Sequence, residues 1–306
     1  MDRKRLLLVA LAGLMLVVAL RLRKEKRNII GSGWPVNLAH RGASALAPEN
    51  TMEAFRLAVE SGAGGLELDV HLTRDGYVVV IHDPTLDRTT DGTGAVAVMT
   101  LDELSETDAG YNFSPDHENT FPYRGLGLRI PTLAEVLREV PGVAVNIDMK
   151  ADNPAIEAAV LEVLRQADAE GRALVVSSRR SAVGRFRRIS GRRVSTGASR
   201  WETGIFYLFS NLRLERFLRP AYDALQVPLS YRGLPLVTRR FVQAAHAVGV
   251  RVDAWTINET AEMRRLLDLN VDVIMTDRPG TLADVLEHRA RGTMSRQPSA
   301  LSRQQS

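Results

Sequence analysis

The sequence predicts an α/β protein: a (β/α)8 TIM barrel with a small insertion after the second strand, preceded by an N-terminal transmembrane helix. The first observation is that short β-branched runs alternate with longer stretches of helical apolar spacing from Val36 to His288. The second is that there are eight such runs, the number that a closed barrel of parallel strands requires. The third is an uninterrupted apolar run near the start of the chain, Leu6–Leu20.

Each predicted strand is a short run rich in Val, Ile, Leu and Ala. The eight runs are Val36–Ala39, Gly65–Val70, Val143–Met149, Ala173–Ser177, Val194–Ala198, Ala224–Leu229, Val250–Thr256 and Val271–Met275. Helical spacing marks the segments between them, including Thr51–Ser61, Thr132–Val140, Ala155–Glu170, Thr238–Val248 and Glu259–Leu269. A doubly wound open sheet is the alternative architecture, although it usually needs fewer strands.

One segment breaks the alternation of strands and helices. The apolar run Tyr77–Ile81 follows the second strand across the turn Arg74–Gly76, and Asp-Gly between two such runs is a hairpin signal. The stretch from His82 to Arg129 is rich in turn residues and has no long helical period. We therefore expect an insertion over about residues 82–130 at one end of the barrel, which resumes at Pro131.

Composition and charge exclude several classes of function. The 306 residues are 45% hydrophobic and 25% charged, which is ordinary globular usage. With 0 Cys, disulfides, thiolate zinc sites and cysteine nucleophiles are impossible. The net charge of +4 is concentrated in residues 1–27 and in the tail, which leaves residues 28–291 with a net negative charge. Because a nucleic-acid-binding protein carries its positive charge on the folded domain, we expect no nucleic-acid partner.

The ends of the chain have their own signals. Leu6–Leu20 has basic clusters on both sides and predicts a single-pass membrane anchor over residues 1–27. A helix of this run is about 22 Å long, short of the ~30 Å hydrocarbon core, and flanking arginine stems make up the difference. A cleaved signal peptide and a buried helix are the alternatives, but the basic stretch Arg21–Arg27 follows at once without a small-residue cleavage site. Basic residues on both flanks leave the side of the membrane open. The Ser-, Gln- and Arg-rich residues 292–306 predict a disordered tail.

Polar side chains gather where the predicted strands end, which is where barrels of this kind place their chemistry. They come from the first three strands and the hairpin, and they comprise His40, Arg41, Glu67, Asp69, His82, Asp148 and Lys150. Glu67 and Asp69 lie two residues apart on one strand, so both side chains point to the same face. Each group alone has an ordinary structural explanation, but their combination at one rim predicts an active site.

The three carboxylates predict a metal site. Glu67 and Asp69 would repel one another, and a hard divalent cation with oxygen ligands relieves such repulsion. Asp148 lies on the neighbouring predicted strand and would complete the ligand set. A metal held there would neutralise the nonbridging oxygens of a phosphate, so phosphoryl transfer is the chemistry that this pattern suits.

The remaining charged groups fit the same reaction. Arg41 would bind a phosphate through paired N–H donors, and Lys150 would act as a point charge. His40 and His82 would supply a general acid and a general base near neutral pH. Glycoside hydrolysis also uses paired carboxylates, but it needs neither a second histidine nor a cationic clamp.

Six segments resemble the glycerophosphodiester phosphodiesterase family in their order and spacing. They are HRGASALAPENTMEAF (His40–Phe55), GLELDVHLTRDGYVVVIHDPTLDRTTDGTG (Gly65–Gly94), IPTLAEVL (Ile130–Leu137), NIDMK (Asn146–Lys150), VDAWTIN (Val252–Asn258) and VIMTDRPG (Val273–Gly280). The likeness covers about residues 36–288. It implies a TIM barrel with a short insertion, one divalent cation (Mg²⁺ or Ca²⁺), and hydrolysis of glycerophosphodiesters to glycerol phosphate and an alcohol.

The resemblance also implies roles for single residues. His40 and His82 match the family's acid–base pair, Arg41 its phosphate-binding arginine and Lys150 its cationic partner. Trp255 matches an aromatic wall beside the glycerol, with ordinary core packing as the alternative.

Two metal ligands of the family are matched and one departs. Glu67 and Asp69 stand at ligand positions, whereas the third ligand is usually Glu and here is Asp148, one methylene shorter.

Two other functions stay open. A membrane-anchored lysophospholipase D would need an apolar rim at the mouth of the barrel, and the apolar stretch after the fifth strand is the candidate: Leu208, Phe209, Leu212, Phe217 and Leu218. A catalytically inactive barrel used as a membrane-tethered binding module would carry a damaged site, but every polar position above holds a competent residue.

Overall fold

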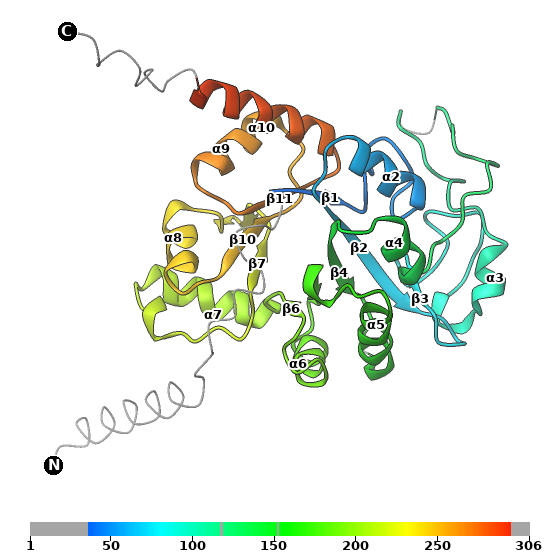
Figure 1. Ribbon diagram of the computed structural model, residues 1–306, viewed down its shortest axis with the longest axis horizontal. Coiled ribbons are helices and arrows are strands. Elements are labelled where there is room, and N and C mark those ends of the chain that lie inside the picture. The colour runs from blue at the N-terminus through cyan, green and yellow to red at the C-terminus, as the bar shows by residue number, and fades with distance from the viewer. Residues whose placement is uncertain (1–35, 117–118, 152, 295–306) are drawn as a thin grey trace, which may run out of the picture.

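The computed structural model describes residues 36–116, 119–151 and 153–294 as eight parallel strands inside a ring of helices (Figure 1). The strands are β1 (Asn37–His40), β2 (Gly65–Leu72), β4 (Ala144–Met149), β5 (Ala173–Val176), β6 (Ser195–Thr196), β7 (Ala224–Val227), β10 (Arg251–Ala254) and β11 (Val273–Thr276). Their order is β6-β5-β4-β2-β1-β11-β10-β7, and a parallel bridge between Gly197 and Ala224 joins the two ends. The TIM barrel is thus confirmed, and the open-sheet alternative is wrong.

Eight helices surround the barrel, one after each strand in chain order (Figure 1). They are α2 (Met52–Glu60), α4 (Leu133–Glu139), α5 (Pro154–Gln166), α6 (Arg180–Ile189), α7 (Arg200–Asn211), α8 (Arg239–Ala247), α9 (Thr260–Asp268) and α10 (Pro279–Met294). Local sequence fixes where several begin: Thr51 caps α2, and Thr132 with Glu135 forms a capping box at α4.

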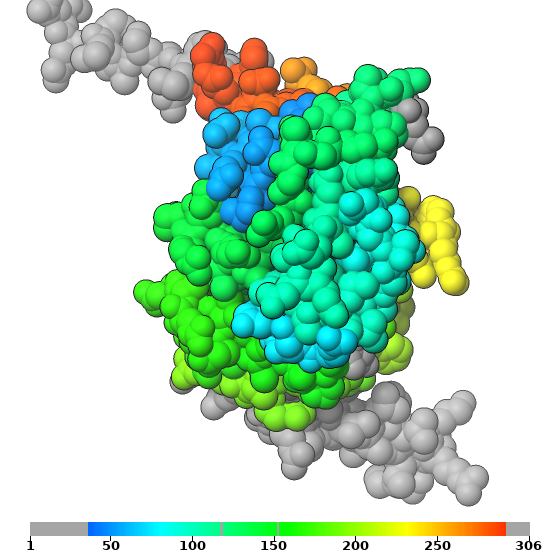
Figure 2. Space-filling model, turned by 90° about the vertical axis from the view of Figure 1, so that its right-hand side faces the viewer, coloured from blue at the N-terminus to red at the C-terminus, as the bar shows by residue number. Residues whose placement is uncertain are grey.

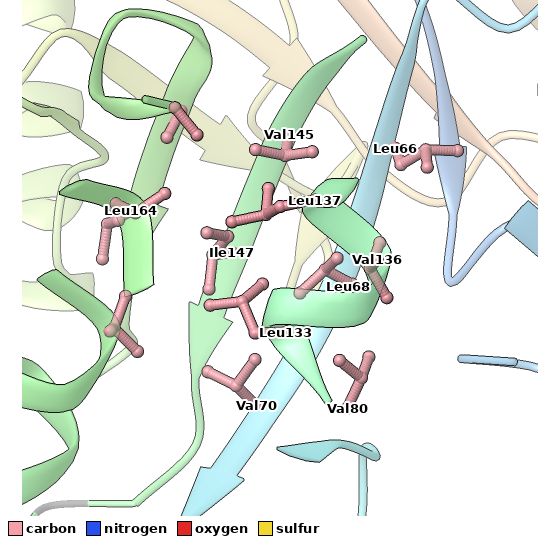
Figure 3. Packing of buried hydrophobic residues seen from close by; sticks show 14 of the residues in the cluster. Leu66, Leu68, Val70, Val80, Leu133, Val136, Leu137, Val145, Ile147 and Leu164 are labelled. Carbon is pink, nitrogen blue, oxygen red and sulfur yellow. The ribbon is translucent and has the colours of Figure 1, made fainter. Parts of the chain in front are cut away.

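Alternation along β2 and β4 separates the core from the site. Leu66 and Leu68 of β2 and Val145 and Ile147 of β4 point outward, where Figure 3 shows them meeting Leu133, Val136 and Leu137 of α4. Because successive side chains of a strand point to opposite faces, Glu67, Asp69, Asn146 and Asp148 point into the barrel. The hydrophobic packing of the helix layer therefore fixes which carboxylates face inward.

The insertion has a small core of its own. β3 (Val78–Val80) pairs antiparallel with the end of β2, which confirms the predicted hairpin. The segment that follows contains η1 (Val96–Val98) and α3 (Leu101–Ser105) and covers one side of the molecule, cyan to teal in Figure 2. Val78 and Val80 belong to the main core, whereas Val79 packs with the insertion. One short strand thus ties the insertion to the barrel.

Three smaller elements complete the chain: η2 (Glu170–Arg172), η3 (Glu215–Phe217) and a hairpin of β8 (Ser230–Tyr231) and β9 (Leu234–Pro235). The predicted anchor, residues 1–27, lies outside the described residues. The tail predicted over residues 292–306 begins too early, because residues 292–294 continue α10; the rest of it lies outside the described residues. Within the described ranges, we find no helix with the length and apolar character that a membrane span requires.

Candidate active site

The carboxyl ends of the parallel strands form one rim, the mouth of the barrel, and the predicted site residues lie around it. His40 ends β1 and pairs in register with Glu67 of β2. Asp69, two residues further along β2, pairs in register with Asp148 of β4. Lys150 follows β4 directly. Three adjacent strands thus bring these groups to one place, as the sequence predicted.

The turn after β1 depends on a glycine. Arg41 has a left-handed backbone conformation (φ 55°), and Gly42 continues it with φ 85°. A Cβ at Gly42 would lie 2.7 Å from the backbone of Ala54 in α2, so only glycine fits here. The turn brings the backbone N–H of Arg41 to Glu67 Oε2, to which it donates over 3.1 Å.

His40 is held by a carboxylate from the far end of the chain. Its Nδ1 donates to Asp277 Oδ1 over 2.7 Å, and that carboxylate also accepts from Ser44 Oγ (2.9 Å) and Asn258 Nδ2 (2.6 Å). Burial lowers the pKa of His40, but the hydrogen bond to Asp277 and the charge of Glu67 outweigh burial and raise it above 6.5. The other ring nitrogen, Nε2, lies 4.0 Å from Glu67 Oε2.

His82 is held by a chain of ion pairs. Its Nδ1 donates to Asp83 Oδ1 over 2.6 Å, and Arg88 donates to Asp83 Oδ2 over 2.5 Å. Arg88 also makes two hydrogen bonds to Glu49, which accepts from Arg41 Nη1 over 2.9 Å. Burial raises the pKa of Asp83, but Arg88 and His82 outweigh it and bring the pKa to about 2. These ion pairs link the insertion to the loop between β1 and α2, which carries Arg41 and Glu49.

The two carboxylates of β2 have opposite electrostatic environments. Asp69 accepts from Asn50 Nδ2 (2.9 Å) and lies 2.8 Å from Lys150 Nζ and 3.2 Å from Arg41 Nε. Burial raises the pKa of Asp69, but the two cations outweigh it, so the pKa is lowered. Burial and the charge of Asp69 raise the pKa of Glu67 to about 7. The pKa values of these two neighbouring acids are therefore shifted in opposite directions.

Lys150 joins the two strands that carry the acids. Its Nζ lies 2.8 Å from Asp69 Oδ1 and donates to Asp148 Oδ2 over 2.6 Å. Burial lowers the pKa of Lys150, but the two carboxylates outweigh burial and raise it, so the amine stays charged. For Asp148, burial outweighs the attraction of Lys150, and the pKa is raised.

The residues present fit a divalent cation, although the acids do not form a closed ligand shell. No three His, Asp or Glu side chains of the described ranges are grouped closely enough to hold a metal on their own. Asp148 instead turns to Lys150. Glu67 is the position that favours a cation, because it is 5% exposed, has a raised pKa, and accepts one hydrogen bond among the described residues. Its oxygens and those of Asp69 are the hard donors that such an ion prefers.

The mouth also has an exposed aromatic side chain. Trp255 follows β10, and its backbone N–H donates to the carbonyl of Val227 over 3.2 Å. Core packing does not account for this side chain, which is 41% exposed.

The candidate apolar rim lies on the second half of α7 and on η3. Its members are Leu208, Phe209, Leu212, Phe217 and Leu218, of which Leu208, Leu212 and Phe217 are exposed. This part of the chain contacts the start of α8, where Arg240 donates to Glu215 of η3, and the β8–β9 hairpin, where Tyr207 Oη donates to the carbonyl of Pro235 over 3.4 Å. That these side chains border the mouth stays a prediction.

Comparison with known proteins identifies the family. Residues 40–281 match the glycerophosphoryl diester phosphodiesterase family, a range that begins at His40 and ends just after Asp277. The chain belongs to this family. It is therefore placed among the phosphoric diester hydrolases.

Curated phosphodiesterases of this family resemble the chain along most of their length. It is 34% identical over 260 residues to a glycerophosphodiester phosphodiesterase of Caldanaerobacter subterraneus subsp. tengcongensis, covering 81% of this chain and 96% of the relative. A probable glycerophosphodiester phosphodiesterase 2 of Mycobacterium tuberculosis is 34% identical over 262 residues, with 83% and 91% covered.

Solved structures of phosphodiesterases share the barrel. One is a glycerophosphodiester phosphodiesterase of Agrobacterium tumefaciens (TM-score 0.65, 27% identity, covering 81% of this chain and 98% of that one). Another is an Oleispira antarctica phosphodiesterase in complex with the product sn-glycerol-3-phosphate (TM-score 0.66, 28% identity, covering 82% and 96%).

Five residues at the mouth carry no role in the sequence-based prediction, although all lie within the segments that resemble the phosphodiesterase family. They are Glu49, Asn50, Asp83, Arg88 and Asp277. Asp83 has a usable signal, because it directly follows His82. Asp277 directly follows the last strand, β11, so a closed barrel alone places it beside β1 and His40. The Glu49–Arg88 pair spans 39 residues and has no local signal.

Proposed function

We propose that the chain hydrolyses glycerophosphodiesters to glycerol phosphate and an alcohol, with His40 and His82 as the acid–base pair. The observation that carries the proposal is that each histidine bonds its own carboxylate through Nδ1, on a mouth that also holds Arg41 and Lys150. Family membership and the product-bound Oleispira relative support the same substrate class.

The two histidines take different roles in the proposal. The hydrogen bond to Asp277 and the charge of Glu67 raise the pKa of His40 above its usual value, so we assign His40 as the general acid that protonates the leaving alkoxide. His82 accepts the proton of the glycerol 2-hydroxyl as that oxygen attacks phosphorus and the bond to the leaving oxygen breaks, which gives a cyclic phosphate. Water then opens the cyclic phosphate to glycerol phosphate, and the two histidines exchange their acid and base roles in this second step. Arg41 and Lys150 are held by carboxylates at the mouth, where they offset the charge of the phosphate. We place the glycerol against Trp255.

Metal dependence is part of the proposal. Members of this family generally depend on a divalent metal. Glu67 and Asp69 would hold the ion, with Asp148 reaching it only after giving up its bond to Lys150. Such an ion neutralises charge on the nonbridging phosphate oxygens. Mg²⁺ and Ca²⁺ both suit oxygen donors of this kind.

Chelation tests the metal. We expect EDTA to lower turnover of glycerophosphocholine by more than about 100-fold, and added Mg²⁺ or Ca²⁺ to restore it. Calorimetric titration of the metal-free chain and of Glu67→Gln separates binding from activity: the variant is expected to lose heat of binding. Full activity in EDTA would contradict the metal assignment, while release of no alcohol from any glycerophosphodiester would contradict the whole proposal.

A lysophospholipase D activity is the second candidate. The observation that favours it is the set of exposed apolar side chains on α7 and η3, Leu208, Leu212 and Phe217. We expect lysophosphatidylcholine to be turned over at less than about a tenth of the rate of glycerophosphocholine. Measuring choline release from both substrates decides between them, and equal rates would favour the lipid substrate.

A further inference from the structure

Helix α7 is apolar on two faces. Its inner face is buried, with Phe206 packed edge-on against Phe241 at 5.3 Å between ring centroids. On its outer face, Trp201, Leu208 and Leu212 are each more than half exposed. Their spacing of seven and four residues places them on one stripe of the helix.

The stripe continues beyond the helix end. The turn after α7 leads into η3, where Leu214 and Phe217 are also exposed and are joined by the hydrogen bond from Phe217 N–H to the Leu214 carbonyl (3.0 Å). We call these five side chains the α7–η3 surface: Trp201, Leu208, Leu212, Leu214 and Phe217.

The neighbouring helices α8 and α9 have polar outer faces. Helix α8 exposes Gln243 and His246, and α9 exposes Arg264 and Arg265. Single exposed apolar residues are normal on a protein surface, but a continuous row of large ones marks an interaction site.

The α7–η3 surface is bordered by positive charge. Arg213, Arg216 and Arg219 are exposed in the segment that follows α7, and the Arg216 guanidinium lies 4.9 Å from the ring of Phe217. The acid within this segment, Glu215, accepts from Arg240 over 2.5 Å. Apolar side chains interleaved with arginines are typical of helices that lie in the headgroup region of an anionic bilayer.

We propose that the α7–η3 surface docks on an anionic lipid bilayer. The arginines complement lipid phosphates, whereas a second copy of the same surface would bring like charges together. The predicted membrane segment Leu6–Leu20 precedes Val36 in the chain and would hold this surface near a bilayer.

A fluorescent label tests the docking on the full chain. Because the sequence has no cysteine, the variant Leu212→Cys can be labelled with an environment-sensitive dye at that position alone. The matched control is Leu126→Cys, an equally exposed leucine of the insertion. The labelled chains are reconstituted into vesicles of phosphatidylcholine alone or with about 30 mol % phosphatidylglycerol. Unchanged glycerophosphocholine turnover confirms that both variants fold.

We expect emission at position 212 to rise about twofold and shift to the blue in anionic vesicles, with little change at position 126. Reversing charge in Arg213→Glu/Arg216→Glu is expected to remove at least about half of that rise, as is high salt. An equal response at both positions overturns the proposal. The proposal is also overturned if, in detergent micelles without lipid, the emission at position 212 changes with protein concentration. Such a change would show that a second copy of the chain covers the surface.

Discussion

The two histidines of the mouth are held in different ways. His40 ends a central strand, and its carboxylate partner Asp277 comes from the neighbouring strand, 237 residues away in the chain. His82 lies on the way into the insertion, and its partner Asp83 is the next residue. The barrel itself thus builds one pair, whereas local sequence builds the other.

The supports behind the two pairs differ as well. Asp277 is fixed by hydrogen bonds from Ser44 and Asn258, which are neutral groups. Asp83 is fixed by Arg88, whose side chain is 47% exposed and bonds a second carboxylate, Glu49. Exposed ion pairs are weak and screened by salt. We therefore expect Arg88 to hold Asp83, and with it His82, less firmly than Ser44 and Asn258 hold Asp277 and His40.

Removing either imidazole should have the largest effect on activity. We expect His40→Ala and His82→Ala each to lower kcat for glycerophosphocholine by at least about 100-fold, because each loses a proton-transfer group. Stability should separate them. His40→Ala leaves Asp277 without its strongest partner and is expected to cost about 1 kcal/mol or more in the free energy of unfolding. His82→Ala should leave that free energy nearly unchanged.

The stability difference has a definite pH dependence. The folded pKa of His40 is raised, so its contribution is full below about pH 6.5, the ordinary value, and is lost as pH rises through the folded pKa. Urea unfolding of His40→Ala and the parent at pH 6 and pH 9 measures this, and the gap should shrink at pH 9. A gap that widens at pH 9 would contradict the charged pair.

Asp277→Asn should have the next largest effect, confined to the His40 side. The amide keeps the shape but removes the negative charge that favours protonated His40, so the pKa of His40 should fall. As the proposed general acid, His40 would then lose its proton earlier, and the alkaline limb of the kcat profile should move to lower pH. An unmoved alkaline limb would assign the acid role to another group.

The contrast also explains what the sequence could predict. All eight strands, the hairpin and the inward face of Glu67, Asp69 and Asp148 follow from periods of two and of about 3.6 residues, because burial of one face enforces them. Long-range pairs do not follow from periodicity. His40 with Asp277 requires the barrel to be closed, and the engagement of Asp148 by Lys150 depends on side-chain positions that a strand pattern leaves open.

The smallest effect is expected at Arg88. A substitution there tests whether this arginine helps to hold Asp83 and His82 in place. Arg88→Gln breaks the link from Asp83 to Glu49, and Glu49 in turn holds Arg41. Since exposed pairs contribute roughly 0–1 kcal/mol, kcat/KM should fall by about fivefold. Thermal stability should stay the same.

The matched control is Arg74→Gln, which breaks an exposed pair with Glu103 outside the site and should leave kcat/KM unchanged. High salt provides the second arm, because screening acts on the same ion pairs. Salt should lower kcat/KM of the parent more than that of Arg88→Gln, since the variant has already lost the link. Equal salt sensitivity of the two proteins would show that Asp83 holds His82 without Arg88. His82, like His40, would then be held in place without help from an exposed ion pair.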